Sequence, residues 1–142
     1  MSETQVVDKA VEVDNVFGPV IYGYSREQAI EDGVLVDVSE TAREAGFKFP
    51  VCLTSAAYED CVAWDAEDSK RQTIQDIEGR LWDVLWMASL AAKQGGQEIR
   101  FQLYRVPRGG KGRKARLTTL KAVCGPGDDA APTITIMLPE ED

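Results

Sequence analysis

The clearest pattern in the chain is a change of hydrophobic period near residue 95. Residues Arg80–Lys93 are apolar on nearly every side, which predicts a long helix buried on several sides. After it, apolar and polar residues alternate around Ile99–Leu103, Leu120–Val123 and Ile134–Leu138, which predicts three strands. Gly-rich and turn-rich connections between them favour an antiparallel meander that packs on the helix.

Shorter elements are predicted before the long helix. Ser25 and Gln28 have the spacing of a capping box, which predicts a short helix that Gly33 ends. Period-two alternation predicts a strand over 34–38, and the pair Phe49-Pro50 predicts extended backbone. The other predicted elements are a β-prone run at 20–24, a helix over 40–45 capped by Ser39, an amphipathic helix from Thr54 or Ser55 to about Trp64, and one helical turn near Asp68 in an otherwise polar segment 65–79.

These elements predict one small α+β domain. The 142 residues suit a single hydrophobic core. We expect residues 1–15 to form a flexible leader, with an edge strand as the alternative, and residues 16–142 to form the domain. The expected fold has short N-terminal helices and a strand, followed by one long buried helix packed on a C-terminal three-stranded antiparallel meander.

Composition narrows the possible chemistry. The chain contains no histidine, which excludes Ser-His-Asp and Cys-His nucleophiles and every histidine-containing metal site. Cys52, Cys61 and Cys124 are an odd number without CxxC spacing, so we expect buried, reduced thiols and neither a disulfide nor a zinc site. No cofactor, metal site, secretory signal or membrane-spanning segment is expected, and the predicted location is cytoplasmic.

The net charge of −8 is unevenly distributed along the chain. Residues 1–100 carry a net charge of −10, residues 101–127 carry +7 and residues 128–142 carry −5. Basic and acidic segments of this kind can bind different partners or each other.

A predicted hairpin over 105–116 carries most of the basic charge. Its glycines and cations have the composition of a loop that follows a phosphate backbone. No aromatic residue lies between Tyr104 and the end of the chain, so a stacking platform for bases is missing, and a solvated hairpin tip is the alternative. The candidate residues for nucleic-acid or partner binding are Arg105, Arg108, Lys111, Arg113, Lys114 and Arg116.

An acidic surface is the second candidate. Carboxylates that converge in a cleft can hold Mg²⁺ or do acid–base chemistry, but nothing in the spacing enforces convergence, and a solvated face is the alternative. An acidic surface can also occupy the basic groove of a nucleic-acid-binding protein. The candidate partner-binding acids are Asp65, Glu67, Asp68, Asp76 and Glu78.

The tryptophans present a choice between core and interface. Trp82 and Trp86 lie four residues apart and therefore share a helix face, with Trp64 expected nearby. The surrounding apolar density favours core packing over an exposed interface anchor.

Four segments carry a resemblance to a known family: VIYGYSREQAIEDGVLVDVSETAREAGFKFPV, GRLWDVLWMASLAA, FQLYRVPRGGKGRK and LKAVCGPGDDAAPTITIMLPEED. Together they resemble a family of uncharacterised small proteins found mainly on bacterial plasmids, phages and other mobile elements. The resemblance extends over nearly all of the chain beyond about residue 18. It implies an accessory protein of mobile DNA and assigns no site residue.

These observations together favour a non-enzymatic interaction protein. The expected role is stoichiometric inhibition or modulation of a host complex that handles nucleic acids or defends the host, of the anti-restriction or anti-CRISPR type. A nucleic-acid-binding module that uses the basic hairpin is the alternative, and a carboxylate-dependent metal enzyme is a third possibility.

Overall fold

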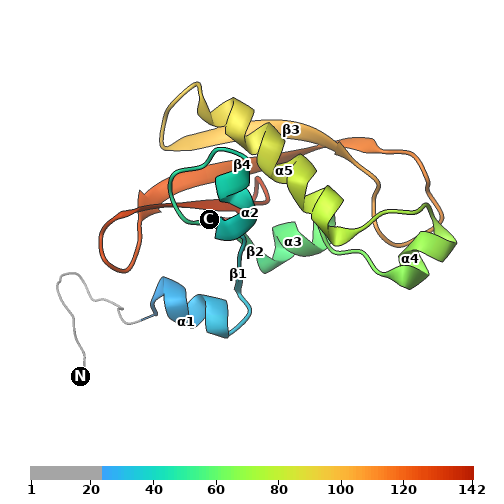
Figure 1. Ribbon diagram of the computed structural model, residues 1–142, viewed down its shortest axis with the longest axis horizontal. Coiled ribbons are helices and arrows are strands. Elements are labelled where there is room, and N and C mark those ends of the chain that lie inside the picture. The colour runs from blue at the N-terminus through green and yellow to red at the C-terminus, as the bar shows by residue number, and fades with distance from the viewer. Residues whose placement is uncertain (1–23) are drawn as a thin grey trace.

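The computed structural model describes residues 24–142, which form a five-stranded mixed sheet with helices packed against it (Figure 1). The strand order is β1-β2-β5-β4-β3. Strand β5 pairs in parallel with β2 and antiparallel with β4, and the remaining neighbours are antiparallel. The predicted α+β class is therefore confirmed.

The C-terminal half supplies three of the strands, β3 (Glu98–Arg105), β4 (Arg116–Pro126) and β5 (Pro132–Met137). Phe101 lies opposite Leu120, and Ala122 lies opposite Ile136, so the apolar residues of the three strands share one face. The predicted period was correct for these strands. The meander is not a complete sheet, however, because β5 pairs on its other side with β2.

Two N-terminal strands complete the sheet, β1 (Leu35–Asp37) and β2 (Val51–Thr54). Strand β1 was predicted from its alternation, but only extended backbone was expected before the third helix. Val51, Cys52 and Leu53 are all buried, so both faces of β2 are covered. A strand of this kind has no polar face and therefore shows no alternation.

Four short helices connect the strands and precede the long one. They are α1 (Arg26–Glu31), α2 (Ser39–Glu44), α3 (Ser55–Cys61) and α4 (Ala66–Arg71). Ser25 caps α1 by accepting from the Gln28 amide, but the Gln28 side chain donates to Asp32 and does not complete the predicted capping box. Ser39 lies inside α2 and bonds to Asp37 and Val51, so its predicted capping role was wrong.

The long helix α5 (Ile77–Ala92) packs with α2 and α3 on one face of the sheet. Its residues Leu81, Val84, Leu85 and Ala88 contact the core, which also contains Phe101 and other residues of the strands. The prediction that this helix is buried on several sides was wrong, because one face of it is exposed. That exposed face carries Trp82, Trp86, Met87 and Leu90.

The predicted leader 1–15, its edge-strand alternative and most of the β-prone run at 20–24 lie outside the described residues. Among residues 24–142, no helix combines the length and apolar character needed to cross a membrane.

Candidate binding surface

Helix α4 begins at a reciprocal pair of carboxylates. The Asp65 side chain accepts a hydrogen bond from the Asp68 amide at 2.8 Å, and the Asp68 side chain accepts one from the Asp65 amide at 2.9 Å. This is a capping box built from two aspartates. The box turns the Asp68 carboxylate inward, where only 2% of the residue is exposed.

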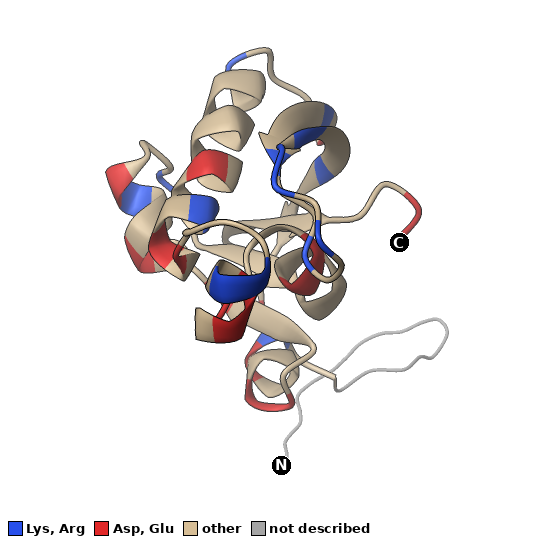
Figure 2. Ribbon diagram, turned by 90° about the vertical axis from the view of Figure 1, so that its right-hand side faces the viewer, with Lys and Arg blue, Asp and Glu red and all other residues tan. Residues whose placement is uncertain are grey.

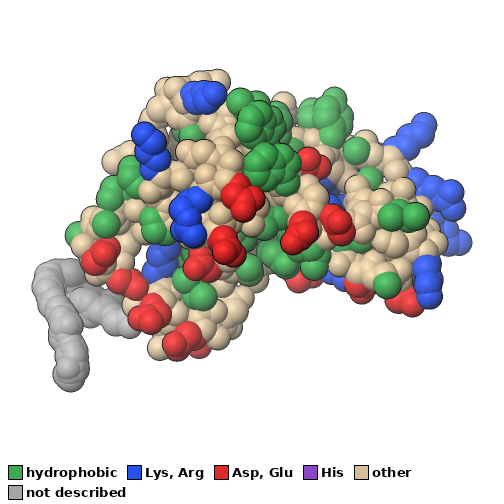
Figure 3. All heavy atoms as spheres, viewed as in Figure 1, with side chains coloured by type: hydrophobic (Ala, Val, Ile, Leu, Met, Phe, Trp, Pro, Cys, Tyr) green, Lys and Arg blue, Asp and Glu red, His purple; other side chains and the backbone are tan. Residues whose placement is uncertain are grey.

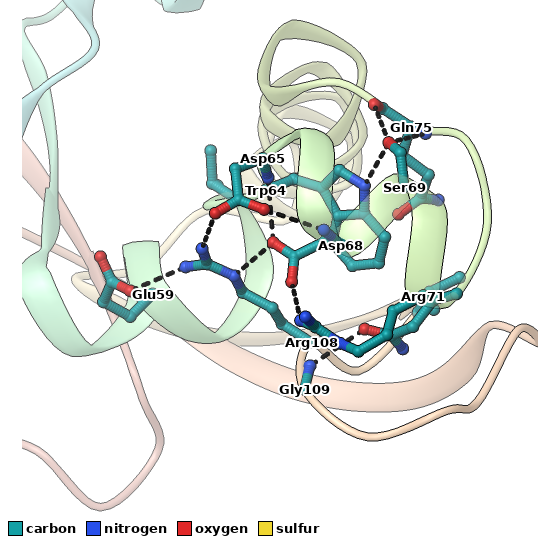
Figure 4. Close-up of polar contacts among 12 residues, drawn as sticks. Glu59, Trp64, Asp65, Asp68, Ser69, Arg71, Gln75, Arg108 and Gly109 are labelled. Atoms are coloured by element: carbon teal, nitrogen blue, oxygen red, sulfur yellow. Dashed lines mark hydrogen bonds and ion pairs between the residues drawn. The ribbon is translucent and has the colours of Figure 1, made fainter.

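The basic loop between β3 and β4 docks on this buried carboxylate. Arg108 Nε donates to Asp68 Oδ2 at 2.7 Å, and the Arg108 guanidinium also pairs with Asp65 at 3.3 Å and with Glu59 at 3.2 Å. Arg71 Nη2 contacts the other Asp68 oxygen at 2.6 Å (Figure 4). The basic and acidic segments of the sequence therefore bind each other at this point, across 40 residues of chain.

A buried glutamine holds the backbone of the same loop. Gln72 Nε2 donates to the carbonyls of Pro107 and Gly112, both at 2.7 Å, and Gln72 Oε1 accepts from the Gly109 amide at 3.0 Å. Gly109 and Gly110 have φ of 89° and 90°, a region that favours glycine. Side chain and backbone geometry together give the loop a defined conformation.

Arg80, at the start of α5, lies beneath this loop and is itself buried. Its guanidinium donates to the carbonyls of Val62 and Val106 at 3.1 and 3.0 Å and to Gln75 Oε1 at 2.7 Å. It also lies 4.5 Å from the centre of a Trp64 ring, within cation–π distance. Burial lowers the pKa of Arg80 below its usual value. Neither Arg80 nor Gln72 was predicted, since Arg80 is a single polar residue beside an apolar run and Gln72 is one of many polar residues in the segment 65–79.

The six predicted basic residues divide into two groups. Arg108 is committed to the contacts with α3 and α4, and Arg105 pairs with Asp60 at 3.0 Å. The other four side chains are exposed and form no ion pair within residues 24–142. Figure 2 shows the loop from the end that it occupies, with blue segments next to red ones. The four exposed cations are Lys111, Arg113, Lys114 and Arg116.

The five predicted acidic residues differ in their contacts. Asp65 and Asp68 cap α4 and bind Arg108 internally, and Asp76 caps α5 by accepting from the Gly79 amide at 2.7 Å. Glu67 lies 3.8 Å from Lys70, and Glu78 is exposed in the first turn of α5. Three of the five acids are therefore structural, because their carboxylate oxygens bond to helix amides or to an arginine of the same chain.

The exposed face of α5 is aromatic. The rings of Trp82 and Trp86 stack with centroids 6.0 Å apart and an interplanar angle of 16°. Trp86 is 45% exposed, so the prediction that these two residues are core was wrong, whereas Trp64 is buried. Side chains coloured as hydrophobic gather over α5 in Figure 3. This aromatic face, defined as Trp82, Trp86, Met87 and Leu90, is the largest departure from the expected structure.

Two shallow grooves border the aromatic face. One, of about 340 Å³, lies between α5 and the end of α2, and its lining includes Phe47 and Leu90. The other, of about 470 Å³, runs between α5 and β3, and its lining includes Met87 and Tyr104. Both grooves are open and contain more apolar than polar groups, which is typical of surfaces that bind other macromolecules.

Groups suited to covalent or metal chemistry do not converge on these grooves. Burial and the neighbouring Asp60 carboxylate raise the pKa of Cys61 to about 11, and burial also raises the pKa of Cys52. Among residues 24–142, no three cysteine or carboxylate side chains gather as metal ligands would. Cys52 and Cys61 are buried free thiols, as predicted, whereas Cys124 is only partly buried.

Comparison with known proteins identifies a family. Residues 14–142 match a family described as "Family of unknown function (DUF6573)". The chain belongs to this family. No curated protein and no solved structure matches it.

Membership of DUF6573 confirms the expected link to an uncharacterised family, and it assigns no reaction. The match begins at residue 14 and includes every element of the fold described above, from α1 to β5. The two exposed features of this DUF6573 protein that suit a partner are the aromatic face of α5 and the loop with its exposed cations.

Proposed function

We propose that this DUF6573 protein acts by stoichiometric binding of another protein, without catalysing a reaction. The observation that supports the proposal is the stacked, exposed pair Trp82–Trp86 on a helix whose opposite face is anchored in the core. Tryptophan is enriched among residues that dominate binding energy, and a rigid helix presents it with little entropic cost. The grooves beside the pair offer space for side chains of a partner.

The exposed cations of the loop indicate the chemistry of the partner. Gln72 and Arg80 bond to the loop backbone, and Asp68 bonds to the Arg108 side chain. The cations Lys111, Arg113, Lys114 and Arg116 therefore lie on an anchored loop and form no ion pair among the described residues. Such a cluster accelerates association with an acidic surface and selects against a basic one. A partner with an apolar anchor site and a nearby acidic patch would match both features.

Carriage on mobile DNA, which the sequence resemblance implies, makes host complexes that handle nucleic acids the first partners to test. In the proposed role, the protein blocks a restriction or CRISPR complex by occupying it one to one. In the proposal, the protein inhibits or modulates such a complex in the cytoplasm. Catalytic turnover of any substrate by the purified protein would contradict this.

Replacing Trp82 and Trp86 together with alanine should weaken binding to such a complex by about 30-fold or more, because each ring is a candidate hot spot of ~1 kcal/mol or above. Isothermal titration of purified nuclease complexes, with stoichiometry fitted, measures the effect. Ile74→Ala is the matched control, since Ile74 is 89% exposed and lies outside α5. Equal affinities for the double variant and the wild type would show that the aromatic face does not contribute to binding.

A second candidate, binding of single-stranded nucleic acid, is favoured by one observation. Tyr104 is 66% exposed at the end of β3, next to the loop, and supplies an aromatic ring that the basic segment itself lacks. The overall charge of −8 opposes this function at long range.

Fluorescence anisotropy with a labelled oligonucleotide tests the second candidate. Four phosphate contacts predict a loss of about 50-fold in affinity between 50 and 200 mM salt. Neutralising Lys111, Arg113, Lys114 and Arg116 together should abolish binding. Neutralising four exposed cations elsewhere (Arg43, Lys48, Lys70 and Lys93) should not. An affinity for the oligonucleotide that does not change with salt concentration, or that is unchanged after the loop cations are neutralised, would exclude this function.

A further inference from the structure

Strand β3 ends the sheet, and its outer side is free of any other described strand. It has eight residues in regular register with β4, and it contains no proline. Natural proteins usually protect an edge of this length with proline, a bulge or a cover, because its unpaired main-chain groups can bind another strand. Among the described residues, only the charges of Glu98 and Arg100 oppose such pairing, since Arg105 is paired with Asp60.

The register shows which main-chain groups of β3 face outward. The Cys124 amide donates to the Gln97 carbonyl at 2.7 Å, so Gln97 and Cys124 form a hydrogen-bonded pair. Such pairs alternate along an antiparallel ladder, and the residues between them direct their amide and carbonyl away from the partner strand. Arg100, Gln102 and Tyr104 therefore present their main-chain groups to the free edge.

An apolar groove follows the same edge. Its lining includes Trp86 and Met87 from α5 on one side and Gln102, Tyr104 and Leu117 from the sheet on the other. A strand added to β3 would direct its side chains alternately toward these two walls. The edge thus combines main-chain partners with apolar contacts on both sides, which is what strand addition requires.

We infer that this edge binds a second copy of the chain, with two β3 strands antiparallel across a two-fold axis, so that the two sheets become one. The sequence of β3 is self-complementary in this arrangement. Registers that keep the outward-facing residues in hydrogen-bonded pairs include one that places Arg100 opposite Gln102 and one that places Arg100 opposite Tyr104. Neither brings two like charges face to face. On the helix face, the first register places Ile99 opposite Leu103, and the second places Phe101 opposite Leu103.

The charge of the chain gives the dimer a distinctive salt dependence. Each copy carries a net charge of −8, so the two copies repel each other at long range, whereas the paired edges are held by main-chain and apolar contacts. Salt screens the repulsion and leaves those contacts in place. Dimerisation should therefore tighten as salt rises, the opposite of what nucleic-acid binding would show.

Two substitutions at one position test the inference. Gln102→Pro removes an outward-facing amide that makes no bond to β4, so the monomer can accommodate it. Gln102→Ala keeps that amide and is the matched control. Light scattering coupled to gel filtration at about 100 μM, where a micromolar dimer is nearly saturated, should give twice the chain mass for the wild type and Gln102→Ala. Gln102→Pro should run as a monomer with an unchanged circular dichroism spectrum.

Hydrogen exchange keeps the inference testable if the proline variant fails to fold. In the wild type, the amides of Arg100, Gln102 and Tyr104 should gain protection as the protein concentration rises through the dissociation constant, since they bond only in the dimer. The amides of Phe101 and Leu103, which bond to β4, should be protected throughout. Any of three results would overturn the inference. These are a monomeric wild type at about 100 μM, a dimeric Gln102→Pro variant, and edge amides whose protection does not change with protein concentration.

Discussion

Replacing Arg80 with methionine is expected to lower the free energy of unfolding by about 3 kcal/mol, or the melting temperature by roughly 10 °C. Methionine fills a similar volume, but it donates no hydrogen bond. The carbonyls of Val62 and Val106 would then be buried without a donor, at about 1 kcal/mol or more each. The stacking contact with Trp64 would also be lost.

Lysine at the same position should recover only part of this stability. Its charge is retained, but a single ammonium lacks the planar fork that reaches Val62, Gln75 and Val106 together. Urea denaturation of wild type, Arg80→Met and Arg80→Lys measures the series, with Arg43→Met on the exposed surface of α2 as the control, expected within about 0.5 kcal/mol of wild type. A loss below about 1 kcal/mol for Arg80→Met would show that the carbonyls find other donors.

The role of Arg80 illustrates what local sequence patterns can and cannot predict. Alternation identified β1, β3, β4 and β5, because apolar and more polar residues alternate along their sequences, even though β5 is buried on both faces. It could not identify β2, because Val51, Cys52 and Leu53 are all apolar and all buried, so neither face of the strand is polar. The parallel pairing of β2 with β5 joins segments about 80 residues apart, and no local pattern encodes it.

The prediction that Trp82 and Trp86 are buried was wrong for a related reason. An apolar helix can be buried on all sides or can leave one face for a partner, and both arrangements give the same composition. The sheet contacts Leu81, Val84 and Leu85, and this choice of face leaves Trp82 and Trp86 outside. The candidate surface is thus a product of tertiary packing, although its residues were already noted in the sequence.

The charge pattern was predicted in outline only. Separate basic and acidic segments were evident, together with the possibility that they bind each other. Which residues pair was not evident, because Arg108 and Asp68 meet only after β3 and α4 are in place. The outcome divides the loop into structural cations and exposed ones, a distinction that matters for every binding experiment.

Replacing Asp68 with asparagine is expected to cost about 2–3 kcal/mol at neutral pH, below the 3–5 kcal/mol typical of a fully buried pair because Arg108 and Arg71 are partly exposed. The change removes the charge that both arginines share and weakens the capping box of α4. Glu67→Gln is the matched control, since Glu67 is exposed and 3.8 Å from Lys70, and it should change stability by less than about 0.5 kcal/mol.

The pH dependence of that difference identifies the carboxylate as the cause. Burial raises the pKa of Asp68, but hydrogen bonds from the Asp65 amide and the Arg108 guanidinium outweigh it and hold the pKa below its usual value. The unfolded chain therefore takes up this proton at a higher pH than the folded chain, so the contribution of Asp68 is complete above about pH 5 and is lost as pH falls through the lowered pKa.

Urea unfolding of wild type and Asp68→Asn across this range should therefore give two stability curves that converge in acid, as protonation removes from the wild type the charge that the variant already lacks. A gap as wide at pH 3 as at pH 7 would contradict the ionic role of Asp68. The same convergence should appear in the mobility of the loop, because Arg108 docks it on this carboxylate. At neutral pH, Asp68→Asn should also speed tryptic cleavage after Lys111 and Arg113, since the Asp68 carboxylate is one of the groups that hold the loop in place, together with Gln72 and Arg80.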